Sequence, residues 1–181
     1  MFKTIIGILA VAVIAIVGFL VIDPNLNNNN SYYLSYVSED LFKVSVEGEV
    51  VKEGTYTLKE GTLMSDLIDA AGGVNDNADQ FAYFLDAELE NGMTYFIASK
   101  YDEKNICSDK ELEKVNINSD DSEKLASVNG ISSSIANSII SYRNEKGIFK
   151  TIEQLLDVYG IGNATYTKIR NYVTLHSWDY F

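Results

Sequence analysis

The chain has 181 residues, of which 46% are hydrophobic, and a formal net charge of −12. This length and apolar content allow one or two folded domains. The single cysteine, Cys107, excludes an internal disulfide and therefore a small disulfide-stapled scaffold. The only histidine is His176, so the sequence offers no Cys/His or Ser/His/Asp set and no zinc cluster, and we expect neither an enzyme nor a bound cofactor or metal.

The N-terminal segment predicts a membrane anchor. Residues 5–22 form an uncharged apolar run, which as a helix would be ~27 Å long, close to the hydrocarbon thickness of a bilayer. A cleaved signal peptide is the less favoured alternative, because the run exceeds the usual apolar core of such a peptide and no small-x-small cleavage site follows it. Lys3 precedes the run and Asp23 follows it, so we expect one span, a cytoplasmic N-terminus and an extracellular bulk.

The next two segments are a spacer and a small mixed domain. Residues 24–42 begin with an asparagine-rich stretch that reads as a polar spacer. Residues 43–99 change in pattern, and we predict strands around Val44 to Val50, 54–58, 81–85 and 93–98, with an amphipathic helix over 61–73. The elements expected in this domain are therefore both strands and a helix.

A charged linker, residues 100–114, leads to a repeat with a spacing of thirty residues. Each copy consists of a short apolar helix, a glycine turn and a second apolar helix, which predicts a tandem helix-hairpin-helix domain over 115–175, followed by a tail over 176–181. The matched residues are Leu125, Val128, Gly130, Ile131, Ala136 and Ile139 in the first copy and Leu155, Val158, Gly160, Ile161, Tyr166 and Ile169 in the second.

The two turns are candidate phosphate sites. The first amides of a helix lack partners within the helix and carry part of its positive dipole end, while glycine lets the backbone approach an anion closely. Nearby basic residues would add charge, although they also fit an ordinary solvated face. The candidate DNA-binding residues are Gly130, Ile131, Ser132, Ser133, Gly160, Ile161, Gly162 and Asn163 in the turns, and Arg143, Lys146, Lys150 and Lys168 nearby.

Together these motifs resemble a known family. The Val-Asn-Ile-Asn lead at 115–118, the Gly-Ile-Phe-Lys joint at 147–150 and Gly-Ile-Gly at 160–162 are similar to the C-terminal domain of ComEA-type competence DNA receptors. The glycine pattern of 46–93 resembles the β-grasp (SLBB-type) domain that such proteins carry before it.

The resemblance implies an α+β multidomain protein with a transmembrane helix, a β-grasp domain and an all-α tandem helix-hairpin-helix domain. It further implies that the chain binds double-stranded DNA without sequence preference during transformation. The resemblance also implies a DNA-uptake machinery as a partner. Self-association or a ligand of the SLBB-like domain is a further expectation. The sequence departs from the family pattern at Ser132, Ile135 and Tyr166, which makes the first hairpin the weaker phosphate site, although Ser132 can cap the helix that follows.

The charge is unevenly distributed along the chain. Residues 31–114 carry a net charge of −11, whereas residues 115–181 carry −1. A nearly neutral helical domain predicts weak DNA binding with a shallow salt dependence. The alternative hypothesis is a surface structural or adhesion protein, whose β-grasp domain binds a cell-wall glycan or a partner protein and whose hairpins serve only as a scaffold.

Overall fold

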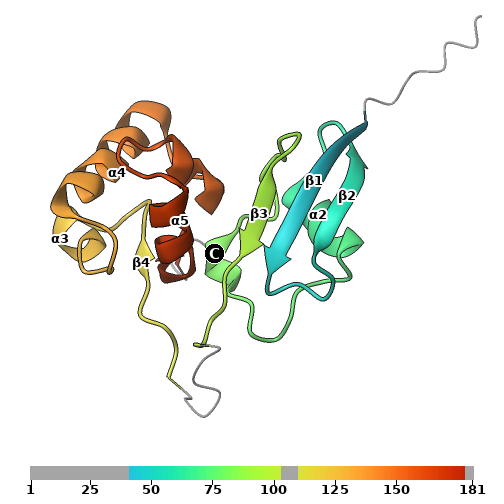
Figure 1. Cartoon of the computed structure of the whole chain (residues 1–181), viewed down its shortest axis with the longest axis horizontal. Helices are drawn as coiled ribbons and strands as arrows, with labels where there is room; N and C mark the ends of the chain where they lie inside the picture. The colour runs from blue at the N-terminus through green and yellow to red at the C-terminus, as the bar shows by residue number, and fades with distance from the viewer. Residues whose placement is uncertain (1–40, 103–109, 178–181) are drawn as a thin grey trace, which may run out of the picture. The chain divides into compact units, whose positions relative to one another are not determined.

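The computed structural model describes residues 41–102 and 110–177 (Figure 1). The predicted membrane anchor and nearly all of the predicted spacer lie outside these residues, as do Cys107 and the last four residues of the chain. Within the described ranges, no helix is long and apolar enough to cross a membrane.

The N-terminal half folds around a three-stranded sheet. Strand β1 (Leu41–Gly48) lies between β2 (Gly54–Lys59), which is antiparallel to it, and β3 (Thr94–Ile97), which is parallel to it. Helix α2 (Met64–Ala70) buries Met64, Leu67 and Ile68 in the same core as the inward-facing valines of β1. The alternation of buried and exposed residues in β1 and the amphipathic spacing of α2 confirm the predicted pattern for these elements.

The strand predicted at 81–85 is wrong. The chain instead forms a short 3₁₀ helix, η1 (Gln80–Ala82), because the Asp79 carboxylate accepts a hydrogen bond from the Phe81 amide and caps the turn. Of the residues predicted as a strand, only Ala82 is buried, and the chain after η1 continues as a loop.

The C-terminal half contains the two predicted hairpins. The first has α3 (Ser122–Leu125) and α4 (Ser133–Lys146), and the second has η2 (Ile152–Asp157) and α5 (Asn163–Ile169), which is followed by η3 (Arg170–Tyr172). The first helix of the second copy is therefore 3₁₀ rather than α. The apolar repeat positions of both copies form one core, as predicted: Leu125, Val128, Ile131, Ala136, Ile139, Leu155, Val158, Ile161, Tyr166 and Ile169.

A short parallel pair of strands, which was not predicted, closes this half. Strand β4 (Val115–Asn116) pairs with β5 (Val173–Thr174). The neighbouring Asn118 donates to the carbonyls of Phe149 and Leu175, each at 2.9 Å, and accepts from the Phe149 amide at 2.8 Å. These bonds give the Val-Asn-Ile-Asn lead and the Gly-Ile-Phe-Lys joint a structural role, since one side chain joins three segments.

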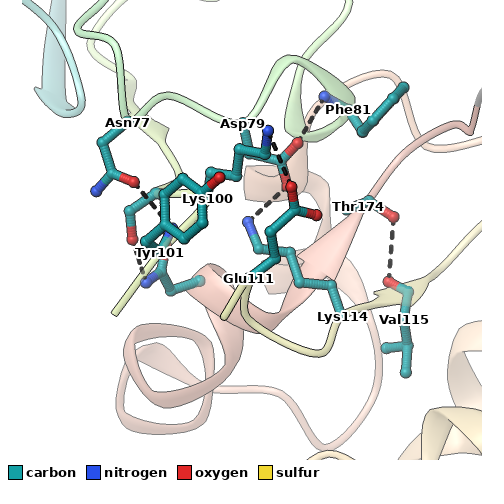
Figure 2. Close-up of polar contacts among 11 residues, drawn as sticks. Asn77, Asp79, Phe81, Lys100, Tyr101, Glu111, Lys114, Val115 and Thr174 are labelled. Carbon is teal, nitrogen blue, oxygen red and sulfur yellow. Dashed lines mark hydrogen bonds and ion pairs between the residues drawn. The ribbon is translucent and has the colours of Figure 1, made fainter. Parts of the chain in front are cut away.

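Polar contacts connect the sheet half and the helical half close to where the chain passes from one to the other (Figure 2). Lys114, which begins the approach to β4, forms an ion pair with Asp79 at 2.6 Å, and both side chains are less than a tenth exposed. Burial lowers the pKa of Lys114, an effect that the adjacent Asp79 carboxylate opposes. Lys100 also pairs with Glu111 at the surface, so residues on both sides of the undescribed stretch 103–109 are held together.

The end of the predicted helical domain, Leu175, and the first residue of the predicted tail, His176, pack inside the molecule. The Leu175 amide donates to the Phe81 carbonyl at 2.8 Å, and the His176 ring stacks on Phe84 with centroids 4.6 Å apart. Leu175 and His176 are both buried. Both residues therefore contribute to the contact with the sheet half.

Candidate nucleic-acid interface

The first hairpin turn is closed by its own backbone and capped by a serine. Gly130 has φ +120°, and a Cβ at this position would lie 2.9 Å from the Ile169 side chain, so only glycine fits. The Ile131 amide donates to the Val128 carbonyl, which closes the turn. Ser132 is the N-cap of α4, and its hydroxyl accepts from the Ile135 amide at 3.3 Å. The capping role predicted for Ser132 is confirmed.

The second hairpin has the same turn, but the N-cap of its second helix is a glycine and provides no side-chain capping bond. Gly160 has φ +92°, and the Ile161 amide donates to the Val158 carbonyl at 3.0 Å. Gly162 is the N-cap of α5, makes no side-chain capping bond, and has open space where a Cβ would be. An exposed Asn163 follows it. The start of α5 thus presents backbone amides with no side chain over them.

The structure divides the predicted turn residues into two roles. Ile131 and Ile161 are buried, and their amides are used inside the turns, so these residues shape the hairpins. Ser132, Ser133, Gly162 and Asn163 are exposed, as a surface for an anion requires.

The predicted cations differ in their freedom to meet a ligand. Lys146 and Lys150 are exposed. Arg143 donates to the Ile117 carbonyl at 2.8 Å, so part of its guanidinium is engaged inside the domain. Lys168 is exposed and donates to Asn129 in the first turn at 2.9 Å, which places the cation of the second copy at the hairpin of the first.

Two further residues at the hairpins were missed by sequence reasoning. Lys124 lines a groove together with Asn129 and Lys168, and its ammonium also lies 3.0 Å from Asp120. Tyr159 immediately precedes Gly160 and is 88% exposed. The thirty-residue register could have indicated Tyr159, since it occupies the position of Asn129 in the first copy.

The remaining distinctive side chains face the sheet half. The Glu153 carboxylate is buried and accepts from the Phe96 amide at 2.8 Å and from the Tyr166 hydroxyl at 2.9 Å. Burial raises the pKa of Glu153 and, with the nearby carboxylate, that of Tyr166. Arg170 lies 3.8 Å from the centroid of the Phe96 ring. Tyr166, a departure from the family pattern, therefore supports the contact between the two halves.

Comparisons with known proteins agree with this arrangement. Residues 43–95 match the SLBB domain family, and residues 110–174 match the helix-hairpin-helix motif family. ComE operon protein 1 of Bacillus subtilis is 32% identical over 147 residues, which cover 76% of this chain and 72% of that protein.

Two other similarities are confined to a short stretch. A Haemophilus influenzae protein is 42% identical over 60 residues, which cover 33% of this chain and 54% of that protein. The mouse endonuclease/exonuclease/phosphatase family domain-containing protein 1 is also 42% identical over 60 residues, but these cover only 10% of its length. The order of the two domains and the extent of the Bacillus match show that this chain belongs to the ComEA-type family of competence receptors.

Proposed function

We propose that this chain is a membrane-anchored receptor that binds double-stranded DNA without sequence specificity and delivers it for uptake in competence. Membership of the competence family and the hairpin domain support DNA as the ligand. The apolar run at 5–22 supports the anchor and an extracellular bulk. By analogy with the family, the bound DNA would pass to an uptake machinery.

The second hairpin carries the proposal. Its exposed turn combines a glycine at positive φ with a helix start whose N-cap, Gly162, has no side chain to occupy the anion position. Such a turn binds a phosphate whatever base is attached, because it contacts only the DNA backbone. The first hairpin would bind less strongly, since the Ser132 hydroxyl already satisfies one amide of α4.

The charge distribution sets the expected strength of binding. The helical domain is nearly neutral, so few counterions are released when it meets DNA. We therefore expect weak binding by a single copy, with a shallow dependence on salt.

Replacing Gly162 with aspartate gives the most direct test. Gly162 has an ordinary negative φ of −101° and room for a Cβ, and aspartate is a favourable N-cap, so Gly162→Asp should fold at least as stably as the natural chain. Its carboxylate would occupy the phosphate position. The full chain in a nonionic detergent is titrated with unrelated duplexes at two salt concentrations.

The matched control is Thr57→Glu, which adds the same charge on the exposed face of β2 in the sheet half. We expect binding that ignores sequence, is lost in Gly162→Asp and is kept in Thr57→Glu. If the natural chain fails to bind duplex DNA at low salt, or if Gly162→Asp binds normally, the proposal is wrong. Cleavage of the DNA on addition of a divalent metal would contradict its assignment as a receptor without enzymatic activity.

A further inference from the structure

The two hairpins differ at one equivalent surface position. In the first, Asn129 precedes the turn glycine and accepts from Lys168 of α5. Thirty residues later, Tyr159 precedes Gly160, and the counterpart of Lys168 is Ser138 of α4. Tyr159 and Ser138 line one groove, just as Asn129 and Lys168 line another. The Asn129–Lys168 pair at the first hairpin is thus replaced at the second by an aromatic ring and a serine.

Tyr159 has no packing role that would explain it. At 88% it is the most exposed of the large hydrophobic side chains in the described part of the chain, whereas the aromatic rings of Phe149 and Tyr166 are buried in the core. An exposed ring on the tip of a turn is available to a ligand that reaches the turn.

The groove beside Tyr159 does not suit an ionic contact. It contains the hydroxyls of Ser134, Ser138 and Ser141, and its charged members are Glu145 and Asp157 against the single cation Lys146. A phosphate gains little in such surroundings, whereas the uncharged deoxyribose can pack on an aromatic ring and serine hydroxyls can bond the strand.

We propose that Tyr159 packs against the sugar edge of a duplex seated on the second hairpin and so supplies a contact that salt does not screen. This rests on the proposed function and adds a residue to the same surface. The two hairpins would then hold DNA by different means: the first through Lys168 and Lys124, and the second through its amides and the Tyr159 ring.

The salt dependence of binding separates the two contributions. Affinities of the full chain in a nonionic detergent are measured for one duplex across a series of salt concentrations. Tyr159→Ala should weaken binding about tenfold at every salt concentration, because a lost aromatic contact releases no counterion. Tyr159→Phe should bind as the natural chain does. Lys168→Ala should instead reduce the salt slope by about one.

Each result has a distinct meaning. The inference is overturned if Tyr159→Ala binds like the natural chain, or if it changes the salt slope as Lys168→Ala does. A natural chain that binds no DNA, or a Gly162→Asp variant that binds normally, would remove the proposed function as well. Thermal unfolding of Tyr159→Ala should match that of the natural chain, since the side chain is exposed, and this excludes misfolding as the cause of weaker binding.

Discussion

Glu153 offers a sharp test of how the two halves of the molecule are joined. Its carboxylate accepts from the Phe96 amide of β3 and from the Tyr166 hydroxyl of α5, and it is 3% exposed. Glu153→Ala would leave the buried Tyr166 hydroxyl and the part-buried Phe96 amide without this acceptor. An unsatisfied buried donor costs about 1–3 kcal/mol, so we expect a loss of about 2–5 kcal/mol in the free energy of unfolding.

Glu153→Gln provides the matched control, because it keeps an oxygen acceptor and removes the charge. Burial raises the pKa of Glu153 in the folded state above its value in the unfolded chain. The unfolded state then loses its proton first, so the stability of the natural chain falls as pH rises from the usual carboxyl range towards the folded pKa. Glu153→Gln lacks this fall. It should therefore gain stability over the natural chain as pH rises to neutrality.

Urea unfolding of segment Glu39–Phe181, which forms one compact unit, measures both effects by circular dichroism from about pH 4 to about pH 8. The midpoint of unfolding of Glu153→Ala should lie at a much lower urea concentration than that of the natural chain. Two results would contradict this role for Glu153. One is a loss of less than about 1 kcal/mol in the free energy of unfolding of Glu153→Ala. The other is a Glu153→Gln variant whose stability depends on pH as that of the natural chain does. Either result would mean that the carboxylate is hydrated or that the halves separate without cost.

Three further predictions concern other contacts. Lys114→Met leaves the buried Asp79 carboxylate without its ion pair and should cost about 3–5 kcal/mol in the same urea assay. Ser132→Ala removes the N-cap bond of α4 and should cost about 1 kcal/mol, measured by thermal unfolding. Arg170→Ala, which loses a ring contact and a surface ion pair with Glu47, should cost about 1 kcal/mol yet leave DNA affinity within twofold, because its guanidinium already faces the sheet half.

Periodicity predicted the elements whose burial repeats regularly. In β1 the buried Val44 and Val46 alternate with more exposed residues, and the repeat positions around Leu125 and Leu155 are buried in one core, so both patterns carry a physical signal. The strand predicted at 81–85 failed because a single side-chain bond from Asp79 decided the local backbone. The β4 and β5 pair was not foreseen, since strands of two residues are too short to show a period.

The candidate site was predicted at the level of the motif and less well at the level of the atom. The repeat located both turns, and the capping role of Ser132 followed from its residue type. No local pattern reveals that Arg143 donates to the Ile117 carbonyl, because this contact forms only when segments distant in the sequence fold together. The thirty-residue repeat places Tyr159 opposite Asn129, but Tyr159 belongs to no periodic apolar pattern and so was not identified as a site residue.

The contact between the halves also determines which charges remain for DNA. Lys114 is buried against Asp79, and Arg170 lies over an aromatic ring of the sheet half, so neither contributes freely to the hairpin surface. The exposed cations near the hairpins are thus fewer than the composition suggests. If the chain binds DNA as proposed, it gains little from electrostatic attraction, and its affinity would depend on the bare helix start at Gly162 and on uncharged contacts such as the one proposed for Tyr159.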